Sequence, residues 1–112
     1  DIKKGGTFPI IHGVRGLALE HGLHETHTDQ RIMKLAELNV LKPEFARELV
    51  QAFRYLMSMR LDSQLSATAG ASGSLMKPAE LSGMDRELLR DSFGVVKQFR
   101  EIVRRHFNLG VF

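Results

Sequence analysis

The sequence predicts an all-α protein, a bundle of four to five largely antiparallel helices. Apolar residues recur at steps of three and four positions in four separate segments, no segment alternates apolar and polar residues, and the β-branched residues are scattered. At 112 residues the chain has the length of one domain, and a domain of this size buries about two-thirds of its unfolded surface. We therefore expect a single domain over residues 1–112.

The first helix is predicted from Pro9 to His21. Proline is tolerated in the first turn of a helix, and Gly22 is a typical stop. Its apolar stripe consists of Ile10, Ile11, Val14, Leu17 and Ala18. A second helix is predicted to have Thr28 as its N-terminal cap and to end near Asn39. Its stripe consists of Ile32, Leu35, Ala36 and Leu38. The short connection that follows favours antiparallel packing of the second and third helices.

The third predicted helix is long and begins at Pro43. Its apolar stripe consists of Phe45, Leu49, Ala52, Phe53, Leu56 and Met57. The pattern then fades into the small-residue stretch SATAGASGS. The segment from Ala67 to Lys77 is the one place where length and composition favour a mobile loop. A short extra turn is expected at residues 78–81.

The fourth helix is predicted to start at a capping box formed by Ser82 and Asp85. Its stripe consists of Leu88, Leu89, Phe93, Val96, Phe99, Ile102, Val103 and Phe107. This helix also carries basic and acidic residues together. The basic ones are Arg86, Arg90, Lys97, Arg100, Arg104 and Arg105, and the acidic ones are Asp85, Glu87, Asp91 and Glu101. Because the signs are mixed, the composition predicts a solvated face and makes nucleic acid the least favoured partner.

Composition excludes several classes of site. The chain has no cysteine, so disulfides, thiolate metal sites and a cysteine nucleophile are excluded, and an intracellular, cytoplasmic setting fits best. No apolar run approaches the roughly 18 residues that a membrane span needs, and no signal-peptide layout is present. The sequence contains no Gly-rich phosphate loop, no Asp-x-Asp pair and no nucleophile with a partnered base. By itself the chain is not predicted to be an enzyme.

A basic, glycine-containing strap precedes the first predicted helix. Lys3, Lys4, Gly5 and Gly6 stand next to a helix N-terminus, whose free amides and dipole attract phosphate. The alternative is a linker whose glycines turn the chain into the helix, and the local sequence favours that alternative.

Two further groups of residues are candidates for binding. His21, His24 and His27 have a spacing that could bring imidazoles onto a metal, but a helix stop falls inside the run, which favours exposed loop histidines. Arg60 and Gln64 lie one turn apart on the third helix. Such a pair is usually solvated or forms a hydrogen bond along the bundle. It is a candidate binding pair only if the strap lies nearby.

Three stretches of the chain carry a family resemblance. They read DIKKGGTFPIIHGVRGLALEHG, THTDQRIMKLAELNVLKPEFARELVQAFRYLMSMRLDSQL and LSGMDRELLRDSFGVVKQFREIVRRHF. In this order they resemble the bacterial nucleotidyltransferase substrate-binding domain, a helical module that follows a catalytic domain, often in chains with CBS and cyclic-nucleotide-binding regulatory domains. More distantly, the layout is similar to the helical segments of PII uridylyltransferase and glutamine synthetase adenylyltransferase.

The resemblance implies a substrate-binding accessory domain of a longer signal-transduction nucleotidyltransferase. The upstream catalytic domain in the same chain would hold the catalytic carboxylates, Mg²⁺ and a nucleoside triphosphate, and would transfer a nucleoside monophosphate to an acceptor. The helical domain would close the cleft and position the acceptor. No catalytic residue, metal ligand or cofactor is expected in residues 1–112.

The shared family elements fall on Asp1, Lys3, Gly5, Gly6, Pro9, Ile10, Arg15, Arg60, Gln64 and Leu65. The substrate- or phosphate-binding residues that the resemblance implies, with the second lysine of the strap, are Lys3, Lys4, Gly5, Gly6, Arg15, Arg60 and Gln64. The alternative function is a non-catalytic regulatory or dimerisation module, whose fourth helix docks regulatory domains or a second copy of the chain.

Overall fold

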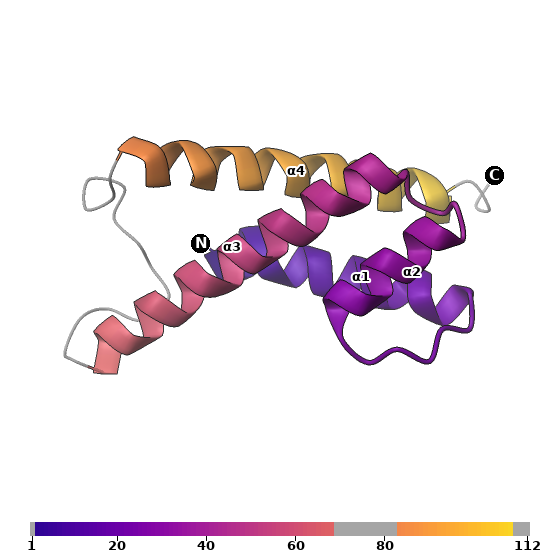
Figure 1. Ribbon diagram of the computed structural model, residues 1–112, viewed down its shortest axis with the longest axis horizontal. Helices are drawn as coiled ribbons and strands as arrows, with labels where there is room; N and C mark the ends of the chain where they lie inside the picture. The colour runs from indigo at the N-terminus through magenta and orange to yellow at the C-terminus, as the bar shows by residue number, and fades with distance from the viewer. Residues whose placement is uncertain (1, 69–82, 109–112) are drawn as a thin grey trace.

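The computed structural model describes residues 2–68 and 83–108, without the side chains of residues 62–68. These residues form four α-helices and no strand, which confirms the predicted all-α class. The helices are α1 (Phe8–Glu20), α2 (Thr28–Glu37), α3 (Pro43–Thr68) and α4 (Gly83–Asn108). A π-helical segment, η1 (Lys3–Thr7), leads into α1 without a break (Figure 1). The fold measures 46 × 26 × 25 Å. None of the helices in these ranges is long and apolar enough to cross a membrane.

The long helices α3 and α4 cross as antiparallel neighbours, whereas α1 and α4 run in the same direction (Figure 1). Tyr55 in the second half of α3 contacts the start of α4, since its hydroxyl donates to the carbonyl of Asp85 at 3.0 Å. Along the parallel pair, Gly5 lies beside Phe93 and Gly16 beside Phe107. The chain reverses direction before α3 and again before α4, so α4 returns to the direction of α1. Helices α1, α2 and α4 therefore run broadly in one direction and α3 runs opposite to them, so the bundle is less antiparallel than the sequence predicts (Figure 1).

The predicted turn at the Gly5–Gly6 pair is wrong. Residues 3–7 are helical, and α1 begins at Phe8 rather than Pro9. Gly6 is buried, and a Cβ added there would lie 3.1 Å from Leu56 Cδ1 and 3.3 Å from Phe93 Cε1. The glycines therefore let η1 approach α3 and α4 closely, and the chain has no need to bend at them.

The first two helices end in the same way. The amide of Leu23 donates to the carbonyl of Ala18 at 3.0 Å, and the amide of Val40 donates to the carbonyl of Leu35 at 2.9 Å. The residue before each donor has positive φ, at Gly22 (66°) and at Asn39 (61°). This is the Schellman arrangement, which uses the conformational freedom of Gly or Asn to satisfy the last carbonyls of a helix. It confirms the predicted stops.

Of the other predicted helix starts, one is displaced, one agrees with the structure and one lies outside the described residues. The N-terminal cap of α2 is His27, in extended conformation, and Thr28 is the first helical residue, so the predicted Thr28 cap is displaced by one position. Pro43 begins α3 as predicted. Ser82 of the predicted capping box, the extra turn at 78–81 and most of the predicted loop fall outside the described residues.

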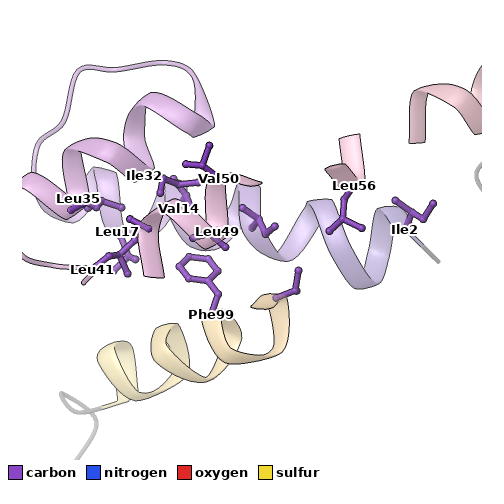
Figure 2. Close-up of a cluster of buried hydrophobic side chains, with 14 of the residues drawn as sticks. Ile2, Val14, Leu17, Ile32, Leu35, Leu41, Leu49, Val50, Leu56 and Phe99 are labelled. Carbon is purple, nitrogen blue, oxygen red and sulfur yellow. The ribbon is translucent and has the colours of Figure 1, made fainter. Parts of the chain in front are cut away.

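One hydrophobic core joins all four helices. Phe99 of α4 is fully buried among residues of α1 and α3, including Val14, Leu17 and Leu49 (Figure 2). Ile2 and Leu56 extend this core toward the N-terminal end of the bundle. Five residues of the predicted stripes are exposed instead, because each helix is covered on one side only: Leu38, Met57, Leu88, Ile102 and Phe107.

Candidate functional site

The aromatic ring of Phe8 brings two of the predicted binding residues together. The Lys3 ammonium lies 5.1 Å from the ring centroid, and the Arg60 guanidinium carbon lies 5.8 Å from it. Lys3 belongs to η1 and Arg60 to α3, which pack side by side through Gly6 and Leu56. Both distances are within the range of cation–π attraction. The strap therefore lies near Arg60. This proximity is what makes Arg60 a candidate binding residue.

Arg60 has an unusual environment for a cation. Its side chain is half-buried, and its Nε atom is buried without a hydrogen-bond partner in the described part of the chain. A buried N–H group without a partner costs about 1–3 kcal/mol. Such groups are rare in folded proteins and require an explanation. The described residues supply no acceptor for this atom, and the side chain of Gln64, one turn further along α3, lies outside the described residues.

A cleft of about 490 Å³ lies on the other side of Phe8, between η1–α1 and α4. Its lining residues are Lys4, Phe8, Pro9, His12, Gly13, Arg100, Val103 and Arg104. The His12 ring stacks on the Phe8 ring at 5.5 Å and 21°. The cleft thus combines cationic groups with aromatic and apolar surface, and Phe8 borders both it and the Lys3–Arg60 pair.

Several cations of α4 share one side of the helix. Five exposed cations lie along one side of the helix because their spacing follows steps of three, four and seven positions: Arg86, Arg90, Lys97, Arg100 and Arg104. Phe93 lies between Arg90 and Lys97, at the position where the same spacing would place another residue of this stripe. Glu87 and Asp91 are out of step with it and lie on a different face. The charged side chains of α4 are exposed or half-buried, and Glu101 pairs with Arg104 and Arg105, so the solvated face of mixed charge predicted from composition agrees with the structure.

One acidic residue stands at the edge of the cleft. Glu101 accepts hydrogen bonds from Arg104, whose Nε lies 3.1 Å from Oε2, and it pairs with Arg105 Nε at 3.4 Å. The hydrogen bond from Arg104 lowers the pKa of Glu101, and the same bond raises the pKa of Arg104. Among the residues that the structure describes, neither Lys4 nor Arg100 takes part in an ion pair.

The sequence of this chain matches a known protein family. The model of a family described as "Putative nucleotidyltransferase substrate binding domain" matches residues 1–107. The chain belongs to this family. The match includes η1, all four helices, the Lys3–Arg60 pair and the α1–α4 cleft. No curated protein and no solved structure matches the chain.

The remaining predicted residues of this substrate-binding domain lie in different surroundings. Lys4 is exposed at the cleft, and Gly5 lies in ordinary contact with Phe93, at 3.6 Å from an added Cβ. Arg15 is exposed on α1, about 10 Å along the axis from Phe8. The positions of Phe8, His12 and Arg15 follow the i, i+4, i+7 spacing of one helix face. Gln64 belongs to α3, but its side chain is outside the described residues.

The histidine run of the substrate-binding domain makes local contacts. His21 Nδ1 lies 2.9 Å from the carbonyl oxygen of Leu17, and His27 Nδ1 lies 3.1 Å from the hydroxyl of Thr26. Within residues 2–61 and 83–108, no group of three or more histidine or acidic side chains is placed to hold a metal ion.

The sequence patterns did not identify Phe8, His12, Arg100 or Arg104 as site residues. The signal for the two arginines was present in their spacing, since Lys97, Arg100 and Arg104 share one face of a helix. The opposing side of the cleft comes from η1 and α1. Local sequence patterns do not show that these segments lie beside Arg100 and Arg104.

Proposed function

We propose that this chain is the substrate-binding accessory domain of a nucleotidyltransferase, of the kind that transfers a uridylyl or adenylyl group. Family membership supports the general assignment. In the proposal, Lys3 and Arg60 bind a phosphate group where the helical domain meets an upstream catalytic domain. The observation that carries it is the meeting of Lys3 and Arg60, from η1 and α3, on the ring of Phe8.

The geometry around Phe8 suits phosphate recognition. Arginine offers N–H groups in a planar fork that matches phosphate oxygens, and lysine adds a compact charge. Contact with the Phe8 ring restricts where Lys3 and Arg60 place their charges. A pre-positioned pair loses less side-chain entropy on binding than two free surface cations. Because Arg60 Nε is buried, the accessible part of its guanidinium group is the part that would contact phosphate.

In the proposed enzyme the catalytic domain carries the carboxylates that hold Mg²⁺ and the nucleoside triphosphate. Transfer of a nucleoside monophosphate depends mainly on positioning and on stabilisation of developing charge. The helical domain contributes by closing the cleft, by positioning the acceptor, and by offering Lys3 and Arg60 to a phosphate. Arg15, Lys4 and Gln64 are proposed to extend this polar edge.

The test is a pair of substitutions in the full-length enzyme. Lys3→Gln with Arg60→Gln should lower kcat/KM for nucleotidyl transfer about 10- to 100-fold, the equivalent of one or two charge-assisted hydrogen bonds. The matched control is Lys42→Gln with Arg47→Gln, which removes two positive charges from exposed positions that form no ion pair with a described residue. Unchanged kinetics in the first double variant, at unchanged thermal stability, would refute the proposed role.

A regulatory or dimerisation module is the second candidate, and one observation favours it. Leu88 and Ile102 of α4 are 47% and 36% exposed, and half-buried Val95 lies midway between them. Apolar residues at seven-residue spacing are typical of helix–helix interfaces. Docking partners would be CBS or cyclic-nucleotide-binding domains, or a second copy.

The second candidate has its own test. A mass in solution that rises with concentration, and falls to the monomer value in Leu88→Glu, would support the module. A concentration-independent monomer would count against self-association.

A further inference from the structure

We propose that the α1–α4 cleft is a nucleotide-binding site distinct from the Lys3–Arg60 pair. The phosphates would lie against Lys4 and Arg100, and the base would pack on the apolar wall formed by Pro9 and Val103. This inference goes beyond the proposed function. The two share Lys4, but Lys3 and Arg60, which carry the proposed function, play no part in the cleft site.

The shape of the cleft limits what it can hold. Its volume of about 490 Å³ falls within the range of small-molecule sites, about 300–1,000 Å³. Phe93 closes the gap between the helices on one side, where it lies against Gly5 and Gly6. Phe107 closes it on the other side, against Gly16. The hollow is therefore confined to the level of Arg100 and Arg104, and it suits a compact ligand better than a long one.

The positive charges of the cleft favour an anionic ligand. Lys4 and Arg100 are exposed and take part in no ion pair with a described residue, so a ligand meets them without displacing a partner. Arg104 at the rim is paired with Glu101, which offsets much of its positive charge. A phosphate chain, with several oxygens, can contact both unpaired cations at once.

The remaining wall of the cleft is not polar. Phe8, Pro9 and Val103 are half-buried, and their exposed parts face the hollow together with the α-carbon of Gly13. His12 stacks on Phe8 and presents a second flat ring. An inorganic anion would leave this surface in water, whereas a purine or pyrimidine would cover it. The combination of two unpaired cations with a flat apolar wall therefore favours a nucleotide over free phosphate.

The cationic stripe of α4 continues beyond the cleft to Arg90 and Arg86, and this provides a matched control. Lys4→Gln with Arg100→Gln removes two positive charges from the cleft. Arg86→Gln with Arg90→Gln removes two from the same stripe, beyond Phe93. All four side chains are exposed, so neither pair should disturb the fold.

The experiment is calorimetric titration of the chain with ATP, tripolyphosphate and adenosine. We expect ATP to bind, tripolyphosphate to bind at least about 10-fold more weakly, and adenosine more weakly still. The cleft pair should weaken ATP binding at least about 10-fold, and the control pair less than about 2-fold. In amide NMR spectra, ATP should shift the Gly13 signal in the wild type and not in the cleft pair.

Several results would overturn the proposal. No heat or amide shift with ATP up to about 5 mM would show that the cleft is not a nucleotide site. Equal affinity for tripolyphosphate and ATP would show a simple anion site without base contact. Equal losses in both variant pairs, with an oligothymidylate binding more tightly than ATP, would assign the whole stripe to single-stranded nucleic acid.

Discussion

The ring of Phe99 occupies the space beside Gly13 in which another residue would carry its Cβ. An added Cβ would lie 2.7 Å from Phe99 Cε2 and 3.1 Å from Val103 Cγ2. Phe99 is fully buried at the centre of the core, so its ring has no free direction in which to move (Figure 2). The close approach of α1 and α4, and with it the floor of the cleft, depends on this glycine.

Gly13→Ala should therefore destabilise the protein by about 1–3 kcal/mol, because overpacking the core outweighs the better helix propensity of alanine. The control is Gly94→Ala on α4, where an added Cβ meets nothing within 4 Å. That variant should gain about 0.5–1 kcal/mol. Chemical denaturation measures both. Equal effects of the two substitutions would contradict the packing between Gly13 and Phe99.

Tyr55→Phe should lower the free energy of unfolding by about 1 kcal/mol. The Tyr55 hydroxyl donates to the carbonyl of Asp85 at 3.0 Å and ties the middle of α3 to the first turn of α4. The ring remains, so little packing is lost. Urea denaturation at neutral pH is the measurement. An unchanged midpoint would mean that this bond adds nothing to the α3–α4 contact.

Tyr55 should also make the fold sensitive to alkali. Burial raises the pKa of Tyr55, and the nearby charge and hydrogen bonding of Asp85 raise it further. Above pH ~10 the unfolded chain loses the tyrosine proton before the folded chain does. Stability is thus present below that pH and falls as the pH rises toward the raised value. The decline should be shallower in Tyr55→Phe, and parallel curves for the two proteins would contradict this.

Arg60→Met should leave stability unchanged or raise it by up to about 1 kcal/mol. The substitution removes a buried N–H group that lacks a partner, and methionine keeps contact with the Phe8 ring. Arg47→Met, at an exposed position of the same helix, should change stability by less than about 0.5 kcal/mol. A clear loss of stability in Arg60→Met alone would make Arg60 a structural residue and weaken its proposed role.

Glu101→Gln should strengthen ATP binding about 2- to 5-fold, because it releases Arg104 and removes a negative charge from the cleft. Glu87→Gln, on a different face of α4, serves as the control and should have no effect. Calorimetry compares the two variants. A weaker affinity in Glu101→Gln would show that Glu101 positions Arg104 for the ligand instead of competing with it.

The Glu101 variant also carries a pH prediction. The pKa of Glu101 is lowered by its hydrogen bond from Arg104, so the associated stability is present above the unfolded pKa and is lost as pH falls through the folded value. Glu101→Gln should lack this acid-dependent loss. Thermal unfolding between pH 7 and pH 3 measures the difference, which should be small because both partners are solvated.

The elements that sequence predicted well are those that local rules control. The starts and ends of α1 to α3 agree with the structure to within one or two residues, and Gly22 and Pro43 act as the stop and start that their chemistry favours. The Gly5–Gly6 pair shows the limit of such rules. The same two residues suit a turn or a close helix contact, and only the presence of Leu56 and Phe93 beside them decides between the two.

The sequence by itself determined the all-α class, the family and most of the boundaries of α1 to α3, because periodicity, capping residues and motif order are properties of one chain segment at a time. Only the tertiary structure decided that Lys3 and Arg60 meet on Phe8, and that Lys4, Arg100 and Arg104 share a cleft. A binding surface requires that particular faces of different helices meet, and that depends on how side chains such as Phe99 and Gly13 fit together across the core.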